Sequence, residues 1–111
     1  MNETLLIKHA VGGRTFIDSS KQTVSYDKQP AGSQWMFTVH VAPDISIEEL
    51  LKWKKELNVF LFQEYDDNRP TTKIWFYVQA DTVKYDKTKQ ELAFTAKSSI
   101  EYIPEQFGYK L

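Results

Sequence analysis

The chain contains no cysteine among its 111 residues. Disulfide bonds, thiolate nucleophiles and thiolate-ligated metal sites are therefore excluded, and the absence fits a reducing compartment. Histidine is also scarce: His9 and His40 are the two present. Neither belongs to an H-x-x-x-H or H-E-x-x-H pattern, which would place two metal ligands on one helix face. We therefore expect no metal site and no cofactor.

An excess of charge of one sign is missing as well. The chain has 14 basic and 15 acidic residues, a net charge of −1. Nucleic-acid-binding proteins usually carry a basic stripe or a positive excess, so the balance argues against such a partner. No apolar run approaches the roughly 20 residues that span a membrane. The N-terminus lacks the basic start and apolar stretch of a signal peptide. We expect a soluble protein with no membrane partner.

Motifs that support catalysis are absent. Gly12-Gly13-Arg14 lacks the spacing of a phosphate-binding loop and precedes a predicted strand instead of a helix. Asp66-Asp67-Asn68 places hard oxygen ligands together, but Arg69-Pro70 breaks the spacing that a calcium loop needs. This second cluster indicates a solvated turn. We expect no catalytic residues and no enzymatic activity.

Aromatic residues, in contrast, are abundant: three Trp, six Tyr and seven Phe. They favour strands and interfaces. Strand patterns at Leu5–His9 and Arg14–Asp18 flank Gly12-Gly13, which predicts a β-hairpin. Gln34–Val41 alternates between apolar and polar residues, as a half-buried strand does.

The segment between these strand patterns is polar. Residues 23–26 alternate only weakly and could form an edge strand. Asp27–Ser33 contains Pro30 and Gly32 and has no apolar residue larger than Ala31. Such a composition predicts a loop that no core contact holds in place.

The middle of the chain, Pro43–Phe62, predicts an amphipathic helix. Ser46 and Glu49 have the spacing of a capping box. From residue 47 onward, apolar side chains recur at the 3.6-residue spacing of a helix face. After Asn58, the run Val59–Phe62 is compatible with either a helix or an extended strand. The polar cluster that follows ends the segment.

The second half predicts an antiparallel sheet. Lys73–Lys84 is rich in β-formers, a polar tip follows at 85–90, and Glu91–Tyr102 alternates over its full length. The length fits a single domain, residues 1–111. We therefore predict an α+β, mainly β protein: an antiparallel β-sandwich or barrel-like sheet with one central amphipathic helix packed on it.

The aromatic run Trp75-Phe76-Tyr77 places large side chains on both faces of one strand. Such a strand is usually central, covered by a helix on one side and by a sheet or a partner on the other. The predicted helix also carries more apolar surface than one sheet side needs, and the surplus is available for another subunit. A different interpretation is a sheet that stacks single-stranded nucleic acid, which predicts Trp75 and Tyr77 exposed beside lysines.

The order of these segments resembles the N-terminal domain of phage distal tail proteins and the related short minor tail proteins. The resemblance lies in the strand QWMFTVHVAP, the helix end at Glu56–Phe62 and the closing Tyr102-Ile103-Pro104, and it covers roughly residues 12–104. That helix end usually carries a Trp in the family, where this chain has Val59.

The resemblance implies a non-enzymatic structural protein of the virion tail, present in the host bacterial cytoplasm before assembly. Its partners would be other copies of itself in a ring and neighbouring tail tube or baseplate proteins. A ring requires a heterologous interface, in which two different patches meet. We expect the interface to include Lys28, Gln29, Pro30, Val59, Phe60, Phe62, Trp75 and Tyr77.

A second hypothesis is a small phage-encoded inhibitor or an immunity-type protein that blocks a larger partner. The size of the chain and its lack of catalytic motifs fit this class as well. The two hypotheses differ in the surface they predict. A structural subunit should present binding surfaces on two opposite sides, whereas an inhibitor should present one concentrated patch, often an acidic one. The near-neutral charge leans slightly against an acidic mimic.

Overall fold

A computed structural model describes residues 2–21 and 24–102, with the backbone alone at residues 45, 98–100 and 102. The elements, in chain order, are β1 (Asn2–His9), β2 (Thr15–Asp18), β3 (Ser25–Ala31), β4 (Gln34–His40), α1 (Ile45–Lys52), the 3-10 turn η1 (Lys54–Glu56), β5 (Leu57–Glu64), β6 (Thr72–Val78), the 3-10 turn η2 (Ala80–Thr82), β7 (Lys84–Asp86) and β8 (Glu91–Tyr102).

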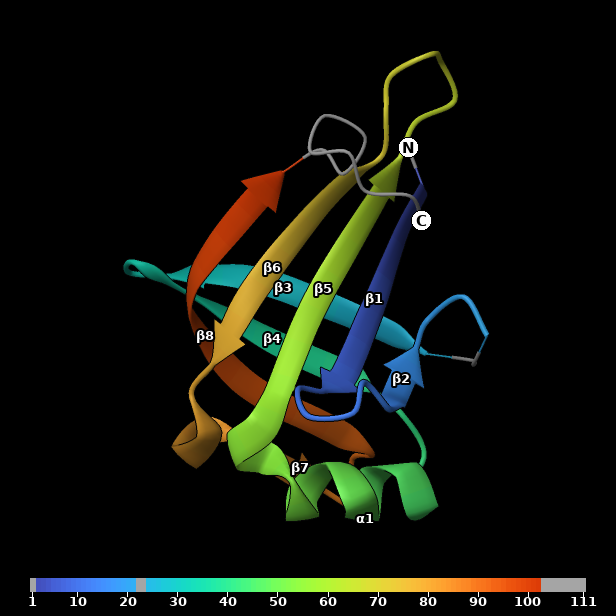
Figure 1. The fold of residues 1–111 in the computed structure, drawn as a ribbon. Helices are drawn as coiled ribbons and strands as arrows, with labels where there is room; N and C mark the ends of the chain where they lie inside the picture. Colours follow the sequence, from blue (N-terminus) through green and yellow to red (C-terminus); the bar gives the residue numbers. More distant parts are fainter. Residues whose placement is uncertain (1, 22–23, 103–111) are drawn as a thin grey trace.

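All eight strands belong to one sheet, in the order β2-β1-β5-β6-β8-β4-β3, with β7 paired to β8. Every described pair is antiparallel. Residues 91–96 of β8 pair with β4, and residues 96–102 pair with β6. This strand therefore belongs to both halves of the sheet. Figure 1 shows the result: β1, β5 and β6 run across β3 and β4 as two facing layers.

The core lies between these layers. The inner sides of β1, β4, β5, β6 and β8 supply fully or almost fully buried side chains, among them Leu5, Ile7, Phe37, Val39, Val59, Leu61, Phe76, Leu92 and Phe94. Phe37 stacks on Phe94 with ring centroids 4.9 Å apart and meets Phe76 edge-on at 5.0 Å. The α+β, mainly β class predicted from the sequence is confirmed.

Helix α1 closes one end of the space between the layers (Figure 1). Ile47 and Leu50 point into the core and are at most 3% exposed. The predicted capping box is wrong, because the N-cap is Asp44, whose Oδ1 accepts a hydrogen bond of 3.1 Å from the Ile47 N–H. Ser46 instead lies inside the first turn of the helix.

The predicted helix is also too long. It ends at Lys52, and Leu57–Glu64 forms the central strand β5, paired with β1 on one side and β6 on the other. Val59–Phe62 is therefore extended. The run is apolar on every position, so both helical and alternating spacings fit it, and pairing on both sides decides in favour of the strand.

The predicted loop at Asp27–Ser33 is wrong as well. Most of this segment belongs to β3, which pairs with β4 from Ser25 to Ala31 and turns back at Gly32-Ser33. Gly32 has a φ of 66°, which glycine adopts without strain. Pro30 is tolerated because β3 is an edge strand, and a proline there removes no hydrogen bond from a central ladder.

Other predicted elements are confirmed. β1 and β2 form the hairpin around Gly12-Gly13, and β4 matches the predicted strand closely. β8 has the predicted bounds, Glu91–Tyr102. The predicted strand at 73–84 is divided into β6, η2 and β7, and β7 forms a hairpin with β8.

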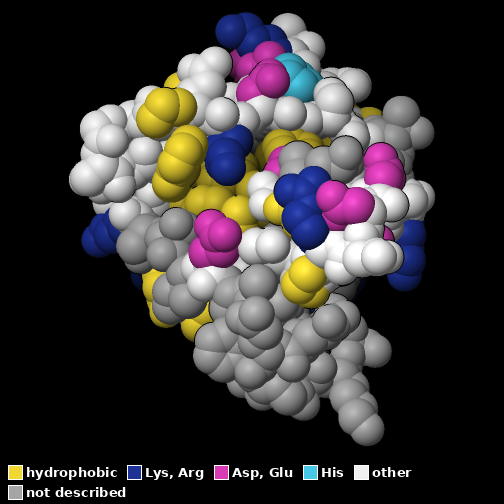
Figure 2. Space-filling view, turned by 90° about the horizontal axis from the view of Figure 1, so that it is seen from above, with side chains coloured by type: hydrophobic (Ala, Val, Ile, Leu, Met, Phe, Trp, Pro, Cys, Tyr) yellow, Lys and Arg dark blue, Asp and Glu magenta, His cyan; other side chains and the backbone are white. Residues whose placement is uncertain are grey.

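Polar contacts join the two layers near the end opposite α1. The Tyr26 hydroxyl on β3 donates a hydrogen bond to Glu3 on β1, and the Gln63 amide on β5 donates to the other Glu3 oxygen at 2.8 Å. The Lys28 Nζ on β3 lies 5.7 Å from the centroid of the Phe76 ring on β6. Figure 2 looks onto this end and shows hydrophobic side chains gathered in its hollow middle, with charged side chains around them.

Candidate interaction surface

The outer side of β5 and β6 carries a row of aromatic side chains. We call Phe60, Phe62, Trp75 and Tyr77 the aromatic face. Register places Phe60 opposite Trp75, while Phe62 lies opposite Lys73. These residues alternate with the buried residues of the same strands, so they point away from the core.

The rings of the aromatic face are held in contact with one another. Trp75 and Tyr77 have centroids 4.7 Å apart, and Phe60 stacks beside Trp75 at 6.2 Å. The Trp75 Nε1–H donates a hydrogen bond of 3.3 Å to the Asn58 side-chain oxygen. These contacts fix the ring orientations before any partner binds, which lowers the entropic cost of association.

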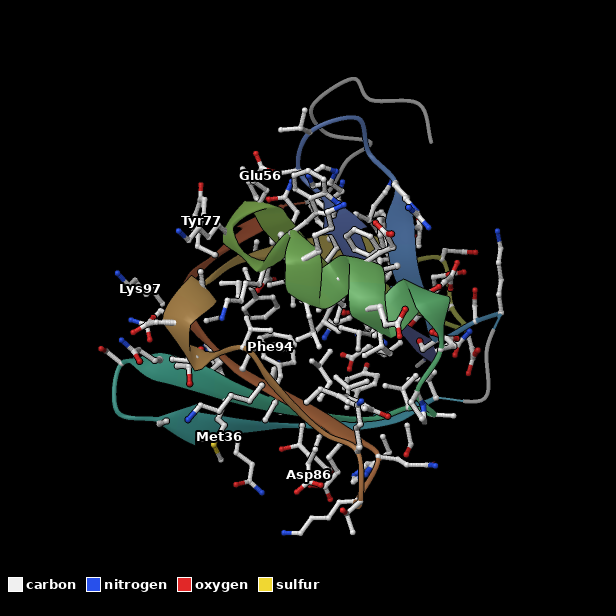
Figure 3. The ribbon with its side chains drawn as sticks, turned by 90° about the horizontal axis from the view of Figure 1, so that it is seen from below. Met36, Glu56, Tyr77, Asp86, Phe94 and Lys97 are labelled. Carbon is white, nitrogen blue, oxygen red and sulfur yellow. The ribbon has the colours of Figure 1, made fainter. Side chains whose placement is uncertain are left out.

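Lysines border the aromatic face. The Lys73 Nζ lies 4.3 Å from the Phe60 ring centroid and 5.3 Å from that of Phe62. Such cation–π contacts keep the ammonium group at the ring surface. Lys8 on β1 is paired with Asn58 on β5, and Asn58 is paired in turn with Tyr77 on β6. Lys97 extends the basic border onto β8, and Figure 3 shows it pointing outward near Tyr77.

The inner and outer sides of β6 differ sharply in exposure. Phe76 is 1% exposed, whereas Tyr77 is 41% exposed. Helix α1 does not cover the aromatic face, because it lies at the end of the layers (Figure 1). Within residues 2–21 and 24–102, no helix covers the outer side of β5 and β6.

The outer side of β3, β4, β7 and β8 forms a second surface, whose residues Asp27, Met36, His40, Asp86 and Glu91 we call the acidic face. One exposed lysine, Lys84 on β7, lies on the same side, opposite Ala93. Met36 is 43% exposed. The His40 Nε2 lies 3.8 Å from Asp27, and its Nδ1 lies 3.8 Å from Glu91. Asp86 on β7 is paired with Glu91. Carboxylates therefore gather around one imidazole on this face.

A shallow basic pocket of about 500 Å³ lies beyond the end of β6. Its lining includes Lys54, Lys55 and Lys97, together with Gln79 and Asp81. The lysines come from η1 and β8, two segments that the fold brings together. The pocket adds positive charge next to the aromatic face.

The structure brings together half of the predicted interface residues. Phe60, Phe62, Trp75 and Tyr77 form one surface. Val59 is fully buried in the core, so its side chain is not part of any surface. Lys28, Gln29 and Pro30 lie on the β3 edge, in the other layer.

Sequence reasoning missed the acidic face. The sequence patterns gave no reason to single out Met36, His40 or Glu91 as interface residues, and they predicted a loop at Asp27. The pairing of β4 with β8 joins the β3–β4 hairpin to a strand about fifty residues further along the chain. The alternation of β4 did indicate that Met36 lies opposite the core side, which is the signal that could have found it.

The first histidine has a structural contact. His9 Nε2 lies 2.9 Å from a Glu56 carboxylate oxygen, and the imidazole ring packs 5.1 Å from Trp53. These contacts tie the end of β1 to η1. Within the described part of the chain, no group of three or more His, Asp or Glu side chains is placed to hold a metal ion.

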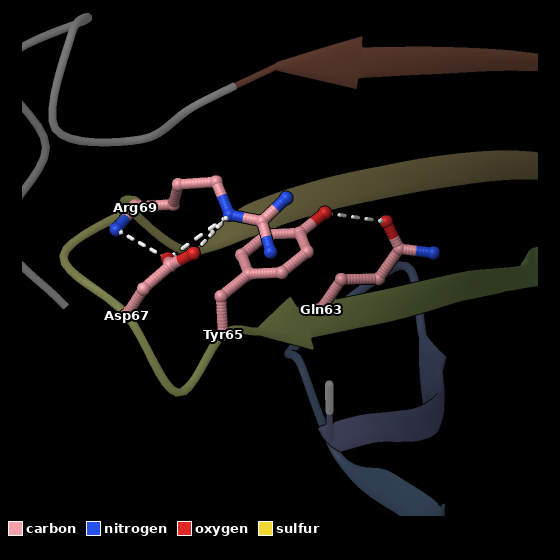
Figure 4. Close-up of polar contacts among 4 residues, drawn as sticks. All are labelled: Gln63, Tyr65, Asp67 and Arg69. Atoms are coloured by element: carbon pink, nitrogen blue, oxygen red, sulfur yellow. Dashed lines mark hydrogen bonds and ion pairs between the residues drawn. The ribbon is translucent and has the colours of Figure 1, made fainter.

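The turn after β5 is a small charged cluster (Figure 4). The Arg69 Nε donates to both Asp67 carboxylate oxygens at 2.9–3.0 Å, and the guanidinium carbon lies 4.1 Å from the Tyr65 ring centroid. The backbone N–H and the guanidinium of Arg69 lower the pKa of Asp67. The arrangement confirms the predicted turn, since Arg69 satisfies this carboxylate within the loop.

No protein-family model, curated protein or solved structure matches the chain. In the described residues, no helix has the length and apolar character needed to cross a bilayer.

Proposed function

We propose that the protein is a non-enzymatic structural subunit that assembles with copies of itself into a ring in a phage or phage-derived tail or baseplate. The observation that carries the proposal is the aromatic face, in which Phe60, Trp75 and Tyr77 contact one another, Lys73 lies over Phe62, and α1 leaves all four rings uncovered. Tyr77 is exposed and the other three rings are half-buried. Apolar side chains grouped in this way on one surface often mark a protein interaction site.

The resemblance to phage distal tail and short minor tail proteins supplies the setting. Those families imply a mainly β domain flanked by one helix, and this chain has that class of fold. The neighbours would be tail tube or baseplate proteins, and the location would be the virion tail, with the host cytoplasm before assembly.

The edge strand β3 offers a further contact. It has one paired side, toward β4, among the described strands. An unpaired edge can add a strand from another chain. Gln29 and Pro30 at its end are exposed, and the proline limits such pairing to part of the edge. We therefore assign the main contact to the aromatic face and a secondary contact to β3.

The test is the mass of the protein in solution, measured by light scattering after size exclusion over a concentration series. We expect a mass that rises above the 13.0 kDa of one chain toward a closed ring. Tyr77→Glu should abolish this rise, because burying a carboxylate without a partner opposes association. Val11→Glu is the matched control, since Val11 is 62% exposed but lies in the β1–β2 turn.

A monomer at every concentration would contradict self-assembly. It would favour the second candidate, an inhibitor or immunity-type protein, which the concentration of aromatic side chains on one face supports. In that case a single purified partner should bind the wild type and the Val11→Glu variant and should not bind Tyr77→Glu.

A further inference from the structure

We propose that the aromatic face of one copy packs against the acidic face of the next, so that each subunit contributes a different face to every contact. This inference rests on the proposed function and names the two surfaces through which the subunits would meet. The occupant of the aromatic face is therefore a second copy of this chain.

Because the two faces lie on different sides of the molecule, a contact between them is head-to-tail. The aromatic face lies on the β5–β6 layer, and the acidic face lies on the β3–β4 layer. Figure 3 shows Tyr77 and Met36 on different sides of the molecule, with Phe94 between the layers. Two faces of one subunit that point apart cannot both be buried in a two-fold dimer of identical patches. They generate a ring if the rotation closes, and a filament if it does not.

The shapes and side chains of the two faces are complementary. Met36 is flexible, polarisable and 43% exposed, and thioether–aromatic contacts are favourable. Its cross-strand neighbours are Gln29 and Thr95, and the next row holds Thr38 and Ala93. Thr38, Ala93 and Thr95 are small, so they leave room beside Met36 for the rings of another sheet, and the longer side chains of Gln29 and Lys84 border that space.

The charges of the two faces are complementary too. Lys8, Lys73 and Lys97 border the aromatic face. On the acidic face, the Asp27 side chain is 71% exposed and that of Glu91 is 34% exposed, and Asp86 adds a third carboxylate beside them. Opposite charges around an apolar centre orient two partners and disfavour contact between like faces. Two aromatic faces, or two acidic faces, would bring like charges together.

The experiment mixes two variants that are each blocked on one face. Tyr77→Glu blocks the aromatic face and leaves the acidic face intact, whereas Met36→Glu does the reverse. Both residues are exposed, so both variants should keep the wild-type circular dichroism spectrum and unfolding midpoint. We expect each variant alone to remain monomeric, with association weakened about tenfold or more. An equimolar mixture should form a complex of two chains and no larger species.

Three results would overturn the inference. If wild-type protein assembles and Met36→Glu assembles equally well, the acidic face is not the partner surface, and the proposed function stands. If the wild type assembles and the mixture gives no two-chain complex, the contact is not head-to-tail between these faces. If the wild type never assembles, the proposed function fails together with the inference. If a glutamate variant folds poorly, the mixing experiment is repeated with Met36→Gln and Tyr77→Ser. The control variant Val11→Glu should assemble as the wild type does.

Discussion

The two faces of strands β5 and β6 carry side chains of similar size and apolar character, yet their surroundings differ. On the inner face, Val59, Leu61 and Phe76 are at most 1% exposed and contact the opposite layer. On the outer face, the rings contact one another and a lysine, and Tyr77 remains 41% exposed. Burial inside the molecule stabilises the fold. The outer rings are less buried, so the comparison separates residues that stabilise the fold from residues that we propose for assembly.

The largest expected effect comes from truncating a ring on the inner face. Phe76→Ala should lower the free energy of unfolding by about 3–5 kcal/mol, because it removes buried contacts and leaves a cavity next to Phe37. Urea unfolding of the monomer measures this value, and Leu61→Ala is a second inner-face variant.

Tyr77→Ala is the matched outer-face control for this prediction. Its effect on the monomer should stay within about 0.5 kcal/mol, as for most surface substitutions. Equal losses for Phe76→Ala and Tyr77→Ala would break the distinction between the two faces.

A smaller effect on the free energy of unfolding is expected where the layers are joined by a hydrogen bond instead of apolar packing. Tyr26→Phe removes the hydrogen bond to Glu3 and should cost about 1–2 kcal/mol, since the acceptor is a charged group. Burial and the adjacent Glu3 carboxylate raise the pKa of Tyr26 above its usual value near 10. The contribution of the neutral hydroxyl is therefore complete below pH 10 and is lost as pH rises through the folded-state pKa.

The pH dependence gives a direct check on this contact. The unfolding free energy of the wild type should fall above pH 10 more steeply than that of Tyr26→Phe. Parallel profiles for the two proteins would show that Tyr26 does not link the layers.

The smallest of these effects concerns the end that α1 closes. Asp44→Ala removes the N-cap and should cost about 1 kcal/mol. Ser46→Ala is the matched control, with an expected change below about 0.5 kcal/mol, because Ser46 lies within the first turn. Thermal or urea unfolding measures both, and a larger loss for Ser46→Ala would restore the capping box predicted from the sequence.

Much of the fold could be predicted from spacing alone where one strand face is polar. Glu91–Tyr102 alternates cleanly, and β8 has those bounds. Prediction of secondary structure failed in two segments that lack alternation, one because both faces are apolar and the other because it is polar. Val59–Phe62 is apolar on both faces, so helix and strand patterns fit equally. Gln29 and Pro30 lie in a strand that is polar because it is an edge, and only its pairing with β4 identifies it.

The candidate surface was predictable in part. Trp75 and Tyr77 share one strand face by simple alternation, so their joint position on the aromatic face follows from sequence. Phe60 joined them once β5 paired with β6 in the observed register. The acidic face depends on the pairing of two hairpins, β3–β4 and β7–β8, that lie far apart in the chain, and neither charge counts nor periodicity encode that pairing.

The double role of β8 has a consequence for how the chain folds. β8 follows every other strand in the described sequence and pairs with β4, β6 and β7. During synthesis, the hairpins β1–β2 and β3–β4 can form early, but the two layers cannot be joined until residue 102 has left the ribosome. Contacts between distant segments are slow to form, and exposed apolar strands promote aggregation in the meantime. Nascent chains that stall before β8 emerges from the ribosome should therefore depend on chaperones. Chains in which β8 has emerged should not.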